Sequence, residues 1–261
     1  MSEALLAFVT GKSPAYLRAH ADEPLPDEIA TKYAALKARL DQGEPLAYIT
    51  GTAGFYRREF LVDRRVLIPR PETEHLLEAA IAFLRLREHP RVLDVGTGSG
   101  AIALTIAAEV PDARVEAVDA SPEALVVAIA NRQRLGLLDR RVAFYLGDLL
   151  DPVAGKRYDA IVANLPYVPT GQGDADLRFE PALALDGGAD GLDVYRRFFA
   201  DAPAALQAGG LLLAEGAPPI ADGLLALARA AFPRAAFPQA SVSLERDYGG
   251  RERYVKVLTP V

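Results

Sequence analysis

The sequence of 261 residues contains no cysteine and only three histidines. Without thiols the chain can form neither disulfides nor cysteine-ligated zinc sites, and it has no cysteine nucleophile. The histidines, His20, His75 and His89, lack the spacing of metal ligands, so we predict no metal site. These absences exclude disulfide scaffolds, thiol catalysis and zinc-finger modules.

The sequence also lacks a surplus of basic residues and a long apolar run. Its formal net charge is −6, whereas proteins that grip nucleic-acid phosphates usually carry a basic surplus. We therefore expect a protein or a small molecule as the substrate, and no direct contact with nucleic acid. No uncharged apolar run reaches the ~18 residues of a membrane span, and the N-terminus does not resemble a secretion signal. These features predict a cytoplasmic protein without a membrane partner.

The first part of the chain predicts helices followed by a hairpin. Apolar residues make up 51% of the sequence, enough for a sizeable core. Residues 1–50 carry them at helical spacing, and residues 48–62 mix aromatic and β-branched residues between glycines, which indicates a hairpin. A short strand is expected at 66–68, and a helix is expected to begin at 72–74.

From residue 91 onward, predicted strands and helices alternate. The expected strands cover residues 91–95, 114–119, 142–146, 158–163, 210–215, 241–245 and 253–258, and the expected helices cover 101–109, 122–135 and 193–207. Such alternation favours a mostly parallel sheet with helices on both faces. The turn sequence Asp247-Tyr-Gly-Gly250 predicts that the last two strands form an antiparallel hairpin. The predicted class is α/β, with a mostly parallel sheet of seven strands ending in that hairpin.

A glycine loop follows the first predicted strand and opens the next helix. It consists of Gly96, Thr97, Gly98, Ser99 and Gly100. Glycine lets the backbone turn sharply and lets a ligand approach closely, and ligands of open parallel sheets bind at the carboxyl ends of the strands. The spacing Gly-x-Gly-x-Gly differs from the dinucleotide fingerprint Gly-x-Gly-x-x-Gly, which disfavours a dinucleotide.

Two carboxylates follow the next two strands. Asp119 ends the second strand, where a carboxylate can hold the hydroxyls of a ribose; a helix cap is the alternative. Asp148 follows the third strand and is expected to hold an adenine amino group, with Leu149 packing on the ring. A glycine loop and two carboxylates in this order fit S-adenosylmethionine, which we predict as the cofactor.

The fourth strand ends in Asn164-Leu165-Pro166-Tyr167. The side-chain oxygen of Asn164 can accept one N–H of a planar amide, and the carbonyl of residue 165 can accept the other. Pinning both hydrogens would aim a poor nucleophile at the methyl group, with Pro166 and Tyr167 completing the catalytic and substrate-binding clamp. Because Asn164 lies beside the glycine loop in such a fold, we also expect it to contact the cofactor. A plain strand-ending turn is the alternative.

With these motifs the chain resembles the glutamine methyltransferases that modify peptide chain release factors. The most specific stretch is Ile68-Pro-Arg-Pro-Glu-Thr-Glu74, whereas the glycine loop is shared by many methyltransferases. The resemblance runs nearly end to end and is carried by residues 43–51, 67–74, 92–104 and 180–195.

The resemblance implies a Rossmann-like class I methyltransferase domain over residues 71–261. Over residues 1–70 it implies a small helical N-terminal domain with a β-hairpin linker, which helps to bind the release factor. The substrate would be the glutamine of a Gly-Gly-Gln loop, and S-adenosylhomocysteine the second product. Arg70 and Glu72 are candidates for the entrance of the site, or for a structural linker. Glu180 and the glycines after it are candidates for a loop over the site, or for a turn.

One position of the clamp departs from the family, which usually has Asn-Pro-Pro-Tyr. Residue 165 is leucine, which keeps the backbone carbonyl but loses the fixed φ of proline. The segment Glu215-Gly-Ala-Pro-Pro219 also differs from the usual family sequence.

Three alternatives stay open. Asn-Leu-Pro-Tyr is similar to the motif of ribosomal RNA adenine dimethyltransferases, so an adenine-N6 methyltransferase acting on RNA or DNA is the main one. The acidic net charge counts against it. The glycine spacing disfavours a nicotinamide oxidoreductase, and Asn164 disfavours a cofactor-binding module without catalysis.

Overall fold

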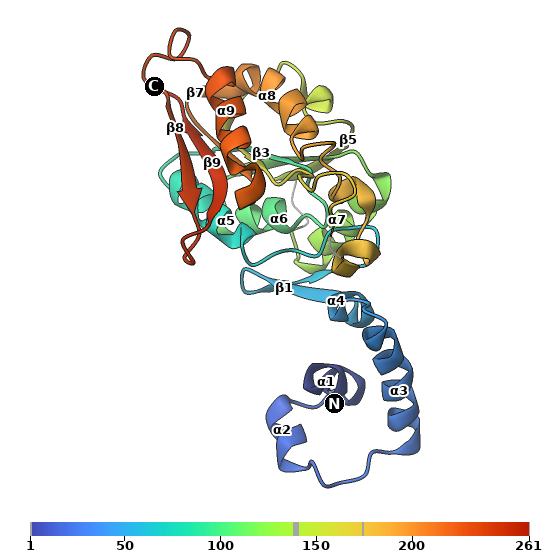
Figure 1. Cartoon of the computed structure of the whole chain (residues 1–261). Helices are drawn as coiled ribbons and strands as arrows, with labels where there is room; N and C mark the ends of the chain where they lie inside the picture. The colour runs from blue at the N-terminus through green and yellow to red at the C-terminus, as the bar shows by residue number, and fades with distance from the viewer. Residues whose placement is uncertain (1, 138–140, 174, 261) are drawn as a thin grey trace.

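The computed structural model describes residues 2–137, 141–173 and 175–260. The chain passes from a helical N-terminal part through a small hairpin into a sheet flanked by helices (Figure 1). The N-terminal helices are α1 (Glu3–Thr10), α2 (Pro14–Ala19), α3 (Asp27–Asp41) and α4 (Leu46–Thr50). Within the described residues, no helix is both long and apolar enough to cross a membrane.

The N-terminal helices have a core of their own. Leu5 and Val9 lie one turn apart on the same face of α1 and pack with Ile49 of α4. Ser2 begins α1 by accepting a hydrogen bond from the backbone N of Leu5 (3.4 Å), and Gly11 ends the helix with a φ of 65°. The cores under the sheet are formed by other residues.

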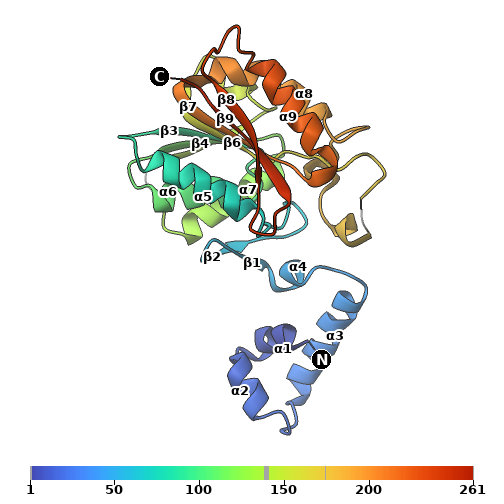
Figure 2. The ribbon, with the colours of Figure 1, turned by 60° about the vertical axis from the view of Figure 1, so that its left-hand side comes forward.

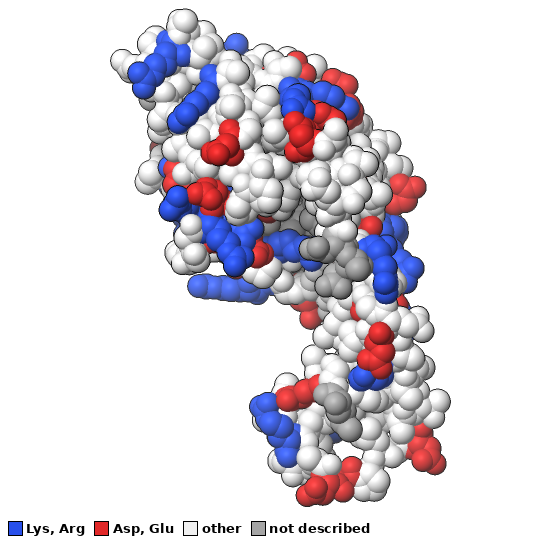
Figure 3. All heavy atoms as spheres, viewed as in Figure 1, with Lys and Arg blue, Asp and Glu red and all other residues white. Residues whose placement is uncertain are grey.

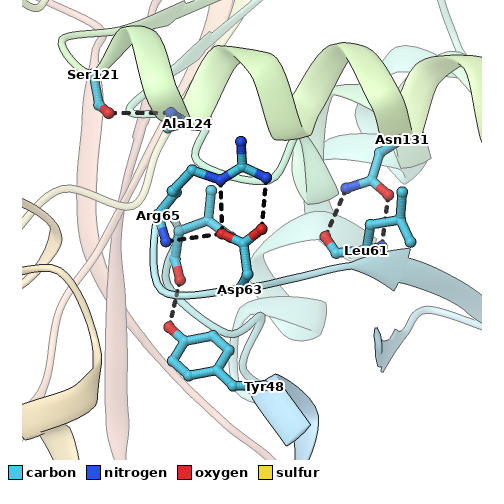
Figure 4. A network of polar contacts seen from close by, with 8 residues as sticks. Tyr48, Leu61, Asp63, Arg65, Ser121, Ala124 and Asn131 are labelled. Atoms are coloured by element: carbon cyan, nitrogen blue, oxygen red, sulfur yellow. Dashed lines mark hydrogen bonds and ion pairs between the residues drawn. The ribbon is translucent and has the colours of Figure 1, made fainter. Parts of the chain in front are cut away.

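The strands β1 (Thr52–Phe55) and β2 (Arg58–Leu61) confirm the predicted hairpin, with an antiparallel register. Tyr56 and Arg57 at its tip have φ values of 44° and 62°, as a two-residue hairpin turn requires. The predicted start was wrong, because residues 48–50 belong to α4. Residues 66–68 are not a strand either. The carbonyl of Val66 accepts a hydrogen bond from the Tyr48 hydroxyl (2.6 Å) instead of from a neighbouring strand (Figure 4).

The sheet has seven strands in the order β5-β4-β3-β6-β7-β9-β8. They are β3 (Arg91–Val95), β4 (Arg114–Asp119), β5 (Val142–Leu146), β6 (Tyr158–Ala163), β7 (Leu206–Glu215), β8 (Ser241–Arg246) and β9 (Glu252–Leu258). Strands β3 to β7 pair in parallel, and β9 runs antiparallel to both β7 and β8. The predicted mostly parallel sheet with a terminal hairpin is confirmed.

Helices cover both faces of the sheet (Figure 2). Helices α5 (Thr73–Leu84), α6 (Ala101–Glu109) and α7 (Pro122–Arg134) lie on one face, and α8 (Asp193–Ala205) and α9 (Ala221–Ala231) on the other. Alternate strand residues point to opposite faces. Val92 therefore joins the core under α5 and α6, and Leu93 the core under α8 and α9. Short 3-10 helices occur at η1 (Asp151–Val153), η2 (Ala175–Phe179), η3 (Ala182–Ala184) and η4 (Pro218–Ile220).

Two further predictions were wrong in the C-terminal half of the sheet. The sequence did not predict α9, which follows directly after the two prolines of η4. The expected helix to residue 207 was too long, because β7 begins at residue 206. The early part of β7 is held by the chain end, where Gly209 N donates to Pro260 O (2.6 Å) and Thr259 contacts Gly210.

The order of the strands reverses between β3 and β6, which pair with each other. Val95 lies opposite Ala163 in this pairing. The next residues along the two chains, Gly96 and Asn164, therefore leave the sheet side by side. This is the topological position at which open α/β sheets bind their ligands.

Asn131 of α7 connects the hairpin to the glycine loop. This side chain is fully buried. Its Nδ2 donates to Leu61 O (3.0 Å) and Ser99 O (2.9 Å), and its Oδ1 accepts from Leu61 N (2.6 Å). Figure 4 shows the pair of bonds between Asn131 and Leu61. One amide thus satisfies backbone groups of both β2 and the loop after β3.

We predict that Asn131→Ala lowers the free energy of unfolding by roughly 2–4 kcal/mol, because it leaves several buried backbone groups without partners. Urea denaturation measures the change. Gln133→Ala is the matched control, since Gln133 is exposed on the same helix, and should cost less than about 0.5 kcal/mol. Equal costs for the two variants would contradict the bridging role of Asn131.

Candidate active site

A pocket with a volume of about 240 Å³ opens at the carboxyl ends of the parallel strands. Most of the site residues predicted from the sequence line it. They are Gly96, Thr97, Gly98, Ser99, Asp119, Asp148, Leu149, Asn164, Leu165 and Pro166. Gly100 and Tyr167 are not among the residues that line it. The structure therefore brings together the glycine loop, the two carboxylates and the first part of the clamp.

The glycine loop lies tightly against its surroundings. Gly96, Gly98 and Gly100 have φ values of 75°, 55° and 80°, a region that favours glycine. A Cβ on Gly96 would lie 3.1 Å from Leu165 Cδ2, and one on Gly100 would lie 2.9 Å from Leu104 Cδ1. Gly100 thus leaves room for the Leu104 side chain, whereas Gly96 lets Leu165 of the clamp approach the glycine loop.

Asp94 of β3 is hydrogen-bonded to the glycine loop and to α6. Its Oδ2 accepts hydrogen bonds from Thr97 Oγ1 (2.7 Å) and Ala103 N (3.1 Å). Complete burial raises the pKa of the Asp94 carboxyl to about 7, and these two bonds oppose the rise. The carboxyl therefore fixes the turn between β3 and α6.

Asp119 connects the glycine loop to the start of α7. Its Oδ2 accepts from Gly98 N (2.7 Å) and its Oδ1 from Ser121 N (2.9 Å). Ser121 itself begins the helix by accepting from Ala124 N (3.1 Å), as Figure 4 shows. Burial raises the pKa of Asp119. A carboxylate has about four acceptor positions, so Asp119 keeps acceptor capacity on the side of the pocket.

Asp148 and Leu149 form the rim after β5. Asp148 pairs with Arg197 of α8, and the two side chains are 55% and 57% exposed. An ion pair this exposed contributes little free energy, so a ligand can replace Arg197. Leu149 has a φ of 46°, which is uncommon for a residue with a side chain. Sequence reasoning missed Arg197, because nothing distinguishes it from other arginines on exposed helix faces.

Asn164 is oriented by Thr73, the first residue of α5. Asn164 Nδ2 donates to Thr73 Oγ1 (3.2 Å), which leaves the side-chain oxygen as the atom that can accept a hydrogen bond from a ligand. Thr73 also lies near the carboxyl of Glu215 of β7. Burial raises the pKa of that carboxyl to about 7, and Thr73 limits the rise. Thr73 was missed, since one threonine at a helix start carries no motif.

Leu165 is 3% exposed and packs in the core on the side of α8 and α9. Its backbone N donates to the Tyr195 hydroxyl (3.2 Å), and that hydroxyl donates to the carbonyl of Glu215. Tyr195 is fully buried, and sequence reasoning also missed it. The backbone at position 165 is thus anchored to the neighbouring strand β7.

Tyr167 is half-buried, and burial raises the pKa of its hydroxyl above the ordinary value. The loop after residue 185 presses on its backbone. A Cβ on Gly187 would lie 2.7 Å from Tyr167 Cα, and one on Gly191 would lie 2.4 Å from Tyr167 O. These glycines let the loop pack against the backbone of Tyr167, and the role of Tyr167 in the clamp stays a prediction.

The segment before α5 and the segment after Glu180 complete the pocket. Arg70 lines it and pairs with the buried Glu180, which also accepts from Ile68 N (3.0 Å). Glu72 points elsewhere and faces Arg253 at 3.6 Å. Further lining residues are Arg65, Val66, Leu67, Pro69, Pro181, Leu183 and Ala184. Across the described residues, we find no cluster of histidine and carboxylate side chains that could hold a metal ion.

The sequence and the fold are similar to those of known methyltransferases. The PrmC N-terminal domain family matches residues 1–51, and the methyltransferase small domain family matches residues 74–179. Over 216 residues the chain is 45% identical to a release factor glutamine methyltransferase of Neisseria gonorrhoeae, covering 81% of this chain and 77% of that protein. The chain belongs to the release factor glutamine methyltransferase family.

Other matches agree with this assignment. A release factor glutamine methyltransferase of Moorella thermoacetica is 42% identical over 255 residues, covering 97% of this chain and 88% of that protein. The crystal structure of a methyltransferase from Pyrococcus furiosus superposes with a TM-score of 0.56 at 18% identity, covering 86% of this chain and 98% of that one, and supports the fold. Membership of this family confirms the predicted family, the Rossmann-like fold and the prediction of an S-adenosylmethionine-dependent methyltransferase. It does not favour the alternative of an adenine-N6 methyltransferase.

We predict that Gly191→Ala destabilises the protein more than Gly250→Ala does. Both glycines have a φ of 78°, but a Cβ meets Tyr167 O only at Gly191 and open space at Gly250. Gly250→Ala should cost roughly 1–2 kcal/mol from backbone strain alone. Gly191→Ala should cost a further 1–3 kcal/mol or so from overpacking. Urea denaturation of both variants measures the difference, and equal values would show that the loop does not press on Tyr167.

Proposed function

We propose that this protein transfers a methyl group from S-adenosylmethionine to the side-chain amide nitrogen of the glutamine in the Gly-Gly-Gln motif of peptide chain release factors. The relatives named for this reaction support the choice of substrate. The observation that carries the proposal is the orientation of Asn164. Thr73 takes its Nδ2, so the amide oxygen can accept an N–H beside the carbonyl of Leu165.

The residues of the pocket fit S-adenosylmethionine. Gly98 lines the pocket, and a Cβ there would meet open space, so a ligand can approach its backbone closely. Asp119 keeps acceptor capacity for the ribose hydroxyls. Asp148 and Leu149 stand at the rim, where the adenine would be held. When bound, the cofactor supplies an electrophilic methyl group on a positively charged sulfur.

The clamp supplies orientation, and no strong base is needed. Asn164 Oδ1 and the carbonyl of Leu165 accept the two N–H groups of the substrate amide, which aims the nitrogen at the pocket. Correct alignment of reacting groups lowers a barrier by several kcal/mol, of the order of 7–11 in favourable cases. As the N–CH3 bond forms, the S–CH3 bond of the cofactor would break and leave neutral S-adenosylhomocysteine, and one amide hydrogen would leave as a proton to water. Pro166 and Tyr167 close the side of the clamp.

We assign substrate recognition to residues 1–70 and methyl transfer to residues 71–261. The separate core of the N-terminal helices supports this division, and the hairpin after them packs Phe55 and Phe60 into the core under α5 and α6. On the face drawn in Figure 3, basic and acidic side chains are intermixed over both parts, which suits a protein partner better than a nucleic acid. A release factor as the substrate places the reaction in the cytoplasm, at the step of translation termination.

We expect the wild-type protein to add one methyl group to the glutamine of the Gly-Gly-Gln motif, and Asn164→Ala to lower the rate by roughly 10²-fold or more, because the nitrogen loses its alignment. The assay incubates the protein with S-adenosylmethionine and an intact release factor and maps the modified residue by mass spectrometry. Ribosomal RNA and DNA serve as competing substrates. Methylation of either one, with no transfer to the release factor, would establish the adenine alternative instead.

We expect Asp119→Ala to weaken S-adenosylmethionine binding roughly 10- to 100-fold, which is the effect of losing hydrogen bonds to a charged group. Isothermal titration calorimetry measures the dissociation constant. Asp151→Ala is the control, because Asp151 is an exposed carboxylate close to Asp148 in sequence and outside the pocket lining. An unchanged dissociation constant for Asp119→Ala would remove Asp119 from the cofactor site.

A further inference from the structure

We propose that Tyr195 is a positioning residue for methyl transfer, because its hydroxyl holds the backbone of Leu165 so that the Leu165 carbonyl faces the substrate amide. This inference rests on the proposed function. It assigns a role to a buried tyrosine outside the pocket lining.

The Tyr195 hydroxyl uses both of its hydrogen-bonding directions. It accepts from Leu165 N (3.2 Å) and donates to the carbonyl of Glu215. A phenol hydroxyl can donate one hydrogen bond while it accepts another. Burial raises the pKa of Tyr195 well above its ordinary value, so the proton needed for the bond to Glu215 is present. The end of β6 is thereby tied to the end of β7.

The aromatic ring of Tyr195 is held in place by its neighbours on α8. Its centroid lies 6.4 Å from that of Phe198 and 6.2 Å from that of Phe199, and all three side chains are buried. A side chain enclosed in this way has little freedom to change rotamer. The position of the hydroxyl is therefore set by the packing of the core.

The bond to Tyr195 acts together with two other restraints on Leu165. It fixes the plane of the peptide between Asn164 and Leu165. Burial of the Leu165 side chain against Gly96 limits rotation about φ, and Pro166 limits ψ by its steric effect on the preceding residue. With the peptide plane, φ and ψ all restrained, the Leu165 carbonyl has one direction. A proline at position 165 would restrain φ through its ring and could not donate this hydrogen bond.

The first test compares Tyr195→Phe with the wild type in release factor methylation, with kcat and KM measured separately. Removing the hydroxyl should lower kcat about 10-fold or more and leave KM for the release factor within about twofold, because alignment is lost while binding is kept. Tyr158→Phe is the matched control. Tyr158 is another fully buried tyrosine, it bonds to Glu116 through its hydroxyl, and it lies at the opposite end of β6 from the clamp. The Tyr158→Phe variant should be less stable than the wild type and have the same kcat.

A double-mutant cycle with Leu165→Pro isolates the hydrogen bond. Proline has no N–H, so in the Leu165→Pro background Tyr195→Phe should change kcat by less than about twofold. Tyr195→Phe also removes the hydrogen bond from Tyr195 to Glu215. It does so in both backgrounds, so this loss does not contribute to the difference between them. Should Leu165→Pro fail to fold, amide hydrogen exchange replaces the cycle. The Leu165 amide should exchange at least about 10-fold faster in Tyr195→Phe, while the Ile161 amide in β6 stays protected.

The outcomes separate this inference from the proposed function. A wild type that methylates the release factor, together with a Tyr195→Phe variant that matches it in kcat, would overturn the positioning role alone. An equal loss of kcat from Tyr195→Phe in both backgrounds would also overturn it, because the hydroxyl would then act through the stability of the core. A wild type that transfers nothing to the release factor would overturn both.

Discussion

The parallel pairing of β3 with β6 is the constraint on which the rest of the site depends. Val95 opposite Ala163 places the glycine loop and the Asn164–Leu165 clamp at adjacent strand ends. Gly96 has a φ of 75°, a region that favours glycine, and a Cβ there would lie 3.1 Å from Leu165 Cδ2. Methyl transfer needs donor and acceptor within near-attack distance, so the register of this strand pair determines whether the cofactor and the amide can meet.

The clamp is held in place by residues from both faces of the sheet. Thr73 begins a helix on one face and orients the Asn164 amide, while Tyr195 comes from α8 on the other face and holds the Leu165 backbone. The Tyr195 hydroxyl also donates to the carbonyl of Glu215 at the end of β7, and Thr73 limits the rise in the pKa of the carboxyl of the same residue. Acceptors fixed by the fold need little reorganisation when the substrate binds, which is how positioning can replace a strong base.

Local patterns were enough to predict most strands, the glycine loop and the order of Asp119, Asp148 and Asn164, because each of these follows from residue type at a strand end. The supporting residues could not be predicted in the same way. Thr73 and Tyr195 act through contacts across 91 and 30 positions of sequence, and a single threonine or tyrosine has no periodicity. The helix α9 was missed behind two prolines, and residues 66–68 were misread because a tyrosine hydroxyl replaces their strand partner.

A crystal structure of the protein with S-adenosylhomocysteine and a release factor tests the central claim most directly. We predict that the amide nitrogen of the Gly-Gly-Gln glutamine lies about 3 Å from both Asn164 Oδ1 and the Leu165 carbonyl oxygen, with Asn164 Nδ2 still donating to Thr73. A glutamine amide bound elsewhere in the pocket would contradict it. An Asn164 side chain turned so that its nitrogen faces the substrate would do the same.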